Sequence, residues 1–224
     1  MTLHTYPDVE QGSQEWHTLR RGIVSASTVG RLLTPTLKIA DNDVSRGMVA
    51  ALVAERVTGF TEDSPMTSDM WRGVEAEPYA RDIYSGHYSQ AVEIGFMRRD
   101  EDGWSLGYSP DGLVGDDGLI EIKSPRAKTH LRTILANEVP AFYMPQLQAG
   151  LLVSGRDWID FVSYVGGMPL FVKRVLPDPA WFSAITAACI AFETSAAQMV
   201  AAYTSATASL PATERVIFDL EMSL

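Results

Sequence analysis

A change of hydrophobic period in the middle of the chain most constrains its fold. Residues 43–59 and 75–84 carry apolar side chains at intervals of three and four, which is typical of amphipathic helices. From residue 91 onward the chain instead has short segments rich in β-forming residues, AVEIGFM, WSLGYS and GLIEIK, separated by the turn sequences DEDG and GDDG. We therefore expect the helices to pack against a sheet that the middle of the chain provides.

The second half of the chain repeats this mixture. Residues 126–135 and 142–153 have helical spacing, WIDFVSYV and PLFVKRVL have the composition of strands, and a long Ala-rich helix is expected from Pro179 to about Tyr203. No internal repeat or low-complexity linker divides the chain. The pattern predicts one α/β domain over residues 1–224, with a central mixed sheet flanked by helices.

Composition excludes several classes of protein. No apolar run reaches the roughly 20 residues that span a bilayer, and the N-terminus lacks the apolar core of a secretion signal. We therefore expect a cytoplasmic protein without a membrane partner. Cys189 is the one cysteine, which excludes an internal disulfide and a cysteine-ligated cluster, and we expect it to be a small buried side chain.

The formal net charge of -10 argues against a nucleic-acid partner, because DNA-binding proteins usually carry a basic surface. The net charge is a sum, however, and a binding site needs only a local basic group. Basic residues gather at Arg20 and Arg21, at Arg98 and Arg99, and between Lys123 and Arg132. Charge therefore disfavours nucleic acid without excluding it.

The most informative segment is Ser-Pro-Asp-Gly at residues 109–112, followed by Glu121-Ile122-Lys123. Side chains alternate along a strand, so Glu121 and Lys123 share one face of GLIEIK while the isoleucines face a core. A hairpin through GDDG would bring Asp111 beside them. The sequence thus gathers two carboxylates and one amine at one end of a strand.

These groups suit phosphodiester hydrolysis. Two carboxylates can hold Mg²⁺, which prefers oxygen ligands and retains several waters, and the Ile122 backbone carbonyl is a further candidate ligand. Lys123 could orient or deprotonate the attacking water, or stabilise charge that develops on the phosphate. An acidic-x-Lys strand can also be an ordinary solvent-facing strand, and two carboxylates also serve glycosidases, although the lysine has no evident part in that chemistry.

With three further blocks, these residues resemble a known family. Trp16 to Ser27 (WHTLRRGIVSAS), Arg72 to Arg81 (RGVEAEPYAR) and Tyr143 to Gln148 (YMPQLQ) stand in the order found in the viral recombinase branch of the PD-(D/E)XK nucleases, that of lambda exonuclease and YqaJ-type proteins. The resemblance covers a core at about residues 16–175 and leaves a C-terminal helical segment at 179–224. It implies a restriction-endonuclease-like fold.

The resemblance also implies an activity. Members of this branch are Mg²⁺-dependent 5′→3′ exonucleases on linear double-stranded DNA, and they leave 3′ single-stranded tails for recombination. The expected metal is Mg²⁺, with Mn²⁺ as a substitute. The expected partners are DNA ends, a single-strand annealing protein and other copies of the chain in a trimeric ring, in the cytoplasm of a bacterial host.

Further site residues follow from the resemblance. It implies Glu77, which Gly73 precedes by four positions, as a third acidic residue that binds metal beside Asp111, Glu121 and the Ile122 carbonyl. Four residues are candidates for holding the 5′-terminal phosphate of DNA, because they offer a guanidinium fork, hydroxyls or an amide: Arg20, Ser27, Ser109 and Gln146. In a plainer reading, Ser27 is an N-cap and Gln146 a polar helix residue.

Two other functions stay open. An endonuclease could use the same fold and catalytic residues. A DNA-end-binding recombination protein could keep the fold without catalysis. Digestion of linear and closed circular DNA distinguishes these functions.

Overall fold

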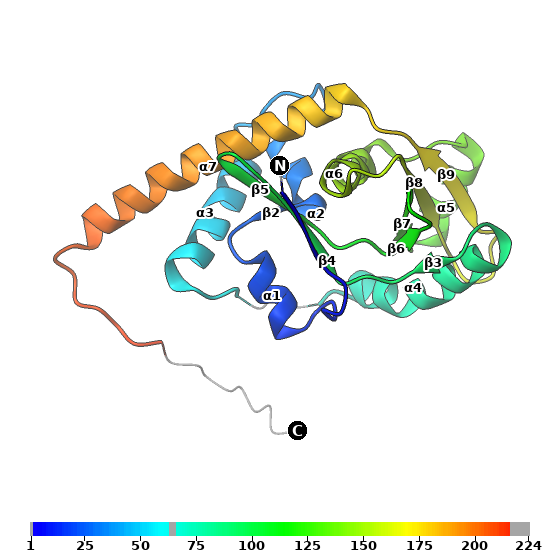
Figure 1. Ribbon diagram of the computed structural model, residues 1–224, viewed down its shortest axis with the longest axis horizontal. Helices are drawn as coiled ribbons and strands as arrows, with labels where there is room; N and C mark the ends of the chain where they lie inside the picture. Colours follow the sequence, from blue (N-terminus) through cyan, green and yellow to red (C-terminus); the bar gives the residue numbers. More distant parts are fainter. Residues whose placement is uncertain (1, 63–65, 216–224) are drawn as a thin grey trace, which may run out of the picture.

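The computed structural model describes residues 2–62 and 66–215 (Figure 1). Two short 3₁₀ helices, η1 and η2, accompany the regular elements. In chain order the elements are β1 (Thr2–Tyr6), α1 (Gln14–Arg20), β2 (Val24–Ser25), α2 (Ala26–Val29), η1 (Gly30–Leu32), α3 (Asp43–Thr58), α4 (Ser68–His87), β3 (Ala91–Val92), β4 (Phe96–Glu101), β5 (Trp104–Tyr108), β6 (Gly112–Val114), β7 (Gly118–Lys123), α5 (Ala127–Ala136), η2 (Ala141–Tyr143), α6 (Met144–Ser154), β8 (Trp158–Ser163), β9 (Phe171–Val175) and α7 (Pro179–Thr207).

The strands form two sheets, where the sequence predicts one central sheet. One has the order β1-β4-β5-β2 and the other the order β3-β6-β7-β8-β9. Both are mixed, because β2 pairs with β5 and β7 with β8 in parallel, whereas the other pairs are antiparallel. The sheets separate where β5 ends at Tyr108 and Pro110, which has no N–H to donate, interrupts strand pairing before β6 begins at Gly112.

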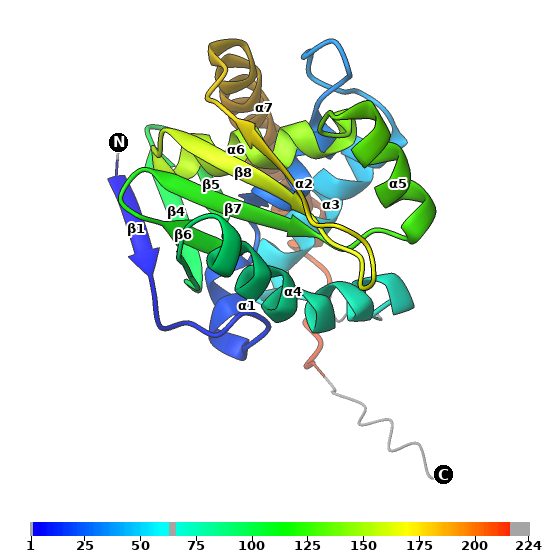
Figure 2. The same ribbon diagram turned by 90° about the vertical axis from the view of Figure 1, so that its right-hand side faces the viewer.

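Helices cover both faces of the five-stranded sheet, with α4 on one face and α6 on the other (Figure 2). The alternation predicted for GLIEIK is confirmed on β7. Ile120 and Ile122 pack in a cluster with Tyr84 of α4, whereas Leu119 packs in the main core with Leu147 of α6. Glu121 and Lys123 therefore lie on the α6 side, as the period of two requires.

The predicted helices occur, with different boundaries. The helix expected at 75–84 is α4 and begins earlier, because the Thr67 side chain accepts a hydrogen bond from the Met70 N–H and caps it. The beginning of α4 thus lies in the segment 61–69 (TEDSPMTSD), whose composition is typical of a loop; residues 63–65 fall outside the described residues. The end of the C-terminal segment expected at 179–224 also falls outside them, from residue 216 onward.

The helix α7 is long and apolar enough to cross a membrane by length and composition alone. One of its faces nevertheless packs in the main core through Ile185, Cys189 and Phe192, which are at most 2% exposed. The expectation of a buried Cys189 is confirmed. Length and composition are weak indicators of a membrane span when a helix packs in this way.

A buried hydrogen bond anchors α4 to the sheet, at a carboxylate that also pairs with an arginine of the neighbouring strand β9. The Tyr84 hydroxyl donates to Asp160 Oδ2 at 2.7 Å, and Arg174 donates to both carboxylate oxygens of Asp160 at 2.9 and 3.0 Å. Asp160 is 3% exposed and Tyr84 is 1% exposed. A buried carboxylate needs such donors, so this contact fixes the position of α4 along β8.

Substituting Tyr84→Phe removes the hydroxyl and keeps the ring. We expect the free energy of unfolding to fall by about 1–2 kcal/mol, because Asp160 loses a buried donor. Urea denaturation followed by circular dichroism measures the change. The matched control is Tyr88→Phe, since Tyr88 stacks on Tyr84 but is 55% exposed. Equal effects of the two substitutions would contradict this role of the Tyr84 hydroxyl.

Candidate active site

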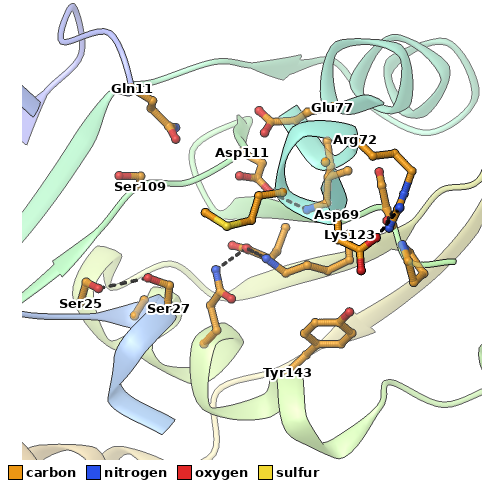
Figure 3. A pocket seen from close by; sticks show the side chains of 18 of the residues that line it. Gln11, Ser25, Ser27, Asp69, Arg72, Glu77, Ser109, Asp111, Lys123 and Tyr143 are labelled. Atoms are coloured by element: carbon orange, nitrogen blue, oxygen red, sulfur yellow. Dashed lines mark hydrogen bonds and ion pairs between the residues drawn. The ribbon is translucent and has the colours of Figure 1, made fainter. Parts of the chain in front are cut away.

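The residues that the sequence selects for catalysis, metal binding and phosphate binding all line one cavity of about 720 Å³. Four separate parts of the chain supply them: the N-terminal segment, α4, the stretch from the end of β5 to β7, and α6. Figure 3 shows the cavity, with Asp111 near its centre. The selected residues are Arg20, Ser27, Glu77, Ser109, Asp111, Glu121, Ile122, Lys123 and Gln146.

Asp111 and Glu121 face each other because of the β6–β7 register. Gly112 pairs with Ile120, so the register continued by one residue places Asp111 opposite Glu121. Asp111 is 9% exposed and Glu121 is 1% exposed. The predicted hairpin through GDDG is therefore present, and it brings the two carboxylates together.

The end of β7 has no β6 residue opposite it, because β6 begins at Gly112. The Ile122 N–H donates instead to Asp111 Oδ2 at 2.6 Å. The N–H and C=O of one strand residue point to the same edge of the strand, so the Ile122 carbonyl faces this side too. This geometry suits the expected role of that carbonyl as a metal ligand.

Glu121 is held by hydrogen bonds from three elements. Lys123 Nζ donates to Oε1 at 2.7 Å and Gln146 Nε2 donates to Oε1 at 2.5 Å, while the Tyr108 hydroxyl donates to Oε2 at 3.0 Å. Tyr108 in turn fits beneath α6 because position 150 is glycine: a Cβ there would lie 2.8 Å from the tyrosine ring. The core thus fixes the orientation of this carboxylate.

Lys123 remains protonated in this environment. Burial lowers the pKa of Lys123, but the carboxylates of Glu121 and Asp111 outweigh it and hold the pKa above its usual value. A lysine with a raised pKa is a poor general base at neutral pH. Of the roles that the sequence suggests for Lys123, this favours orienting water or stabilising negative charge over deprotonating water.

Glu77 approaches the other carboxylates from α4, and Arg81 fixes it there. Arg81 forms an ion pair with Glu77 one turn away, donates to the Asp111 carbonyl oxygen at 2.8 Å and reaches Glu93 at 2.9 Å. Arg81 thus connects α4 to the start of β6. Arg81 is not among the site residues expected from the sequence, where its only signal is the i, i+4 spacing from Glu77.

The carboxylates carry more negative charge than nearby cations neutralise. Burial, Glu121 and Glu77 raise the pKa of Asp111 well above its usual value. Burial also raises the pKa of Glu77, although the Arg81 charge opposes this effect. A cation bound between these carboxyl groups would stabilise their ionised forms.

The donor set fits a hard divalent cation such as Mg²⁺, because it offers carboxylate and carbonyl oxygens. The side chains now bond to protein donors. Within residues 2–62 and 66–215, no three His, Cys, Asp or Glu side chains converge as a metal-holding group. Binding a cation would therefore replace some of these internal hydrogen bonds.

Another end of the cavity offers donors to an anion. Arg20 Nη1 donates to Ser109 Oγ at 3.3 Å, Trp16 Nε1 donates to the same oxygen at 2.8 Å, and the Arg20 guanidinium lies 3.9 Å from the Trp16 ring centroid. Burial lowers the pKa of Arg20 to about 10, although the charge of Glu55 raises it. Among the described residues no carboxylate pairs with Arg20, so a bound anion would stabilise its charge.

The two remaining phosphate candidates differ in their contacts. Ser27 is exposed and its Oγ lies 3.1 Å from Ser25 Oγ; Ser25, and not Ser27, is the N-cap of α2. Gln146 donates to Glu121, so in this structure its amide helps to hold that carboxylate. Trp16 also contributes to the cavity wall.

Comparison with solved structures gives close matches. An alkaline exonuclease, LHK-Exo, from Laribacter hongkongensis is 33% identical, with a TM-score of 0.79 over 89% of this chain and 100% of that chain. Its complex with dAMP matches at 34% identity and a TM-score of 0.78, with the same coverage. A phage-related exonuclease from Haemophilus somnus shares the fold. It is 14% identical, with a TM-score of 0.60 over 81% of this chain and 96% of that chain. No curated protein sequence matches the chain.

The likeness to these structures confirms the expected PD-(D/E)XK-type α/β fold. A family model for the YqaJ-like viral recombinase domain matches residues 15–157, which is more than half of the chain. The matched segment includes all nine residues of the expected site. The chain belongs to the YqaJ-like viral recombinase family.

Proposed function

We propose that this chain is a Mg²⁺-dependent exonuclease that degrades linear double-stranded DNA in the 5′→3′ direction and leaves 3′ single-stranded tails. The observation that carries this proposal is the position of Arg20, a half-buried cation that forms no ion pair with a carboxylate of the described residues, in the same cavity as the acidic cluster. A terminal phosphate on Arg20 would leave the next phosphodiester near the carboxylates. Similarity to an alkaline exonuclease supports the same activity.

The residues divide into three roles. Asp111, Glu121, Glu77 and the Ile122 carbonyl would hold one or two metal ions, which polarise the phosphate and activate water when bound. Protonated Lys123 would donate to the attacking water or to the phosphate oxygens. Arg20, Ser27, Ser109 and Gln146 would bind the terminal phosphate, and Gln146 also donates to Glu121.

The family resemblance supplies further parts of the proposal. We expect a single nuclease domain over residues 1–224 with its core at 16–175, a homotrimer that encircles DNA, a single-strand annealing protein as partner, and a cytoplasmic location. Mn²⁺ should substitute for Mg²⁺, because it accepts the same oxygen ligands.

Digestion of DNA tests the function directly. With Mg²⁺, the protein should degrade linear duplex DNA and leave a covalently closed plasmid intact, and EDTA should abolish degradation. Cleavage of the closed plasmid would favour an endonuclease. Absence of cleavage together with tight binding of ends would favour a non-catalytic end-binding protein.

The same assay tests the phosphate site. Linear DNA with a 5′-phosphate should be degraded faster than DNA with a 5′-hydroxyl, and Arg20→Gln should remove the difference by lowering the rate on phosphorylated ends about tenfold or more. Arg21→Gln is the matched control, since it removes the same charge from a residue outside the cavity wall. Indifference of the unmodified protein to the end group would remove Arg20 from this role.

Removing the lysine tests the catalytic step. Lys123→Ala should lower turnover by about 10²–10³-fold, because a preorganised positive charge at the phosphate is lost, while DNA binding persists. Initial rates and fluorescence anisotropy separate the two effects, and circular dichroism checks folding. Lys128→Ala, at an exposed position on α5, is the control. Full activity of Lys123→Ala would overturn the mechanism.

The metal site makes a prediction about stability. The fold raises the pKa of Asp111, so ionisation of its carboxyl opposes folding, and this penalty shrinks as pH falls from the raised pKa toward the pKa of the unfolded chain. Asp111→Asn removes the charge and can keep the Ile122 hydrogen bond. At neutral pH without metal, we expect the melting temperature to rise by about 2–4 °C.

Asp111→Asn should also lose the upward shift of the melting temperature that Mg²⁺ causes, together with nuclease activity. Differential scanning calorimetry with Mg²⁺ and with EDTA measures both effects. Asp116→Asn, in the exposed turn of the hairpin, should keep the shift. A Mg²⁺-induced shift of normal size in Asp111→Asn would exclude this residue as a ligand.

A further inference from the structure

A pair of arginines lines the cavity at the end away from Arg20. Arg72 belongs to α4, and Arg126 immediately precedes α5. In Figure 3, Asp69 and Arg72 lie on the opposite side of Asp111 from Ser27 and Ser109. The acidic cluster therefore lies between two groups of potential anion donors.

One carboxylate oxygen receives both arginines. Asp69 Oδ1 accepts from Arg72 Nη1 at 2.7 Å and from Arg126 Nη2 and Nε at 3.2 and 3.3 Å. Arg72 is also fixed by the Ser124 carbonyl oxygen, to which its Nη2 and Nε donate at 3.1 and 3.3 Å. Arg126 is 73% exposed, and within the described residues its side chain hydrogen-bonds only to Asp69.

The local charge at this end is positive, although the chain as a whole carries -10. Asp69 supplies one negative charge against the charges of Arg72 and Arg126. The N-terminus of α5, which has ten residues, adds partial positive charge. The hydroxyl oxygen of Ser124, in the same cavity wall, is buried and has no hydrogen-bond partner among the described residues. This end thus has unused capacity to bind an anion.

We propose that Arg72, Arg126 and Ser124 form a second phosphate subsite, and that the Asp69 carboxylate occupies it until DNA binds. The ligand is a backbone phosphate of the cleaved strand, on the 3′ side of the scissile bond. This inference rests on the proposed function, because it assigns the terminal phosphate to Arg20 and the scissile phosphate to the carboxylates between the two ends.

The chemistry favours exchange of Asp69 for a phosphate. A phosphodiester presents two non-bridging oxygens to guanidinium forks, as a carboxylate does, and arginine binds both in this way. The ion pairs of Asp69 with the two arginines lie at the surface. The exposed fraction of the side chain is 40% for Arg72, 52% for Asp69 and 73% for Arg126. Exposed ion pairs contribute little to stability, so releasing Asp69 opposes DNA binding only weakly.

A purely structural reading of the same contacts makes the opposite prediction for Asp69. If Asp69 only stabilises the first turn of α4, neutralising it should weaken the cavity wall and leave DNA binding unchanged or poorer. If Asp69 competes with a phosphate, neutralising it should strengthen DNA binding. The sign of the change in affinity separates the two.

Fluorescence anisotropy measures this with a labelled, 5′-phosphorylated duplex and Ca²⁺ in place of Mg²⁺. We expect Arg126→Gln to weaken binding about tenfold at low salt and to reduce the slope of log Kd against log salt by about one. Asp69→Asn should strengthen binding about two- to threefold. Arg132→Gln, which removes the same charge from an exposed position on α5, is the control.

Single neutral methylphosphonates, placed in turn at the first few phosphodiesters of the cleaved strand, locate the contact. At one position 3′ of the scissile bond, the substitution should weaken binding by the unmodified protein and by Arg132→Gln, but not by Arg126→Gln. Equal sensitivity of all three proteins at every position, or weaker binding by Asp69→Asn, would overturn the subsite. Failure of the unmodified protein to digest DNA with Mg²⁺ would instead contradict the proposed function.

Discussion

The hydrogen bond between the Ile122 N–H and the Asp111 carboxylate determines how the rest of the site is arranged. It occurs where the two sheets separate, and where β7 continues beyond its pairing with β6. An unpaired backbone N–H buried at this point would be destabilising, and Asp111 satisfies it with a side-chain oxygen. The bond therefore stabilises the end of β7 and holds one acidic group opposite Glu121. Asp111 thus both satisfies a backbone N–H of the sheet and supplies a carboxylate to the site.

Local pattern was sufficient to predict the centre of the site. The alternation along GLIEIK and the turn at GDDG place Asp111, Glu121 and Lys123 together, because a hairpin and a period of two are short-range features. The family resemblance added Glu77 and Arg20, which lie far away in sequence. No local rule connects these residues to the strand, and the fold was needed to bring them to one cavity.

Long-range packing explains what the sequence did not reveal. The four-stranded sheet includes the edge strand β1, whose partner β4 lies about 90 residues further along the chain. The role of Arg81 depends on its distance from the Asp111 carbonyl, which is set only when α4 docks on β8 through Asp160. The contact of Gln146 with Glu121 likewise requires α6 to lie over the sheet. A pattern along one segment carries no information about such contacts.

The electrostatic balance of the site also appears only in three dimensions. The sequence left Lys123 with several roles, and its burial beside two carboxylates favours a permanently charged side chain. Arg81 partly neutralises Glu77 but leaves Asp111 with a raised pKa. The site thus stores unfavourable negative charge that a cation would relieve, at the expense of stability in the metal-free protein.

Gly150, in the middle of α6, has a consequence for engineering this protein. Glycine in a helix interior costs about 1 kcal/mol relative to alanine, so a redesign guided by helix propensity would replace it. The Tyr108 ring occupies the space that a side chain would need, and its hydroxyl holds Glu121. A more helical α6 would therefore displace the tyrosine that orients an acidic group. Position 150 therefore keeps a residue of low helix propensity, because a larger one would collide with the Tyr108 ring.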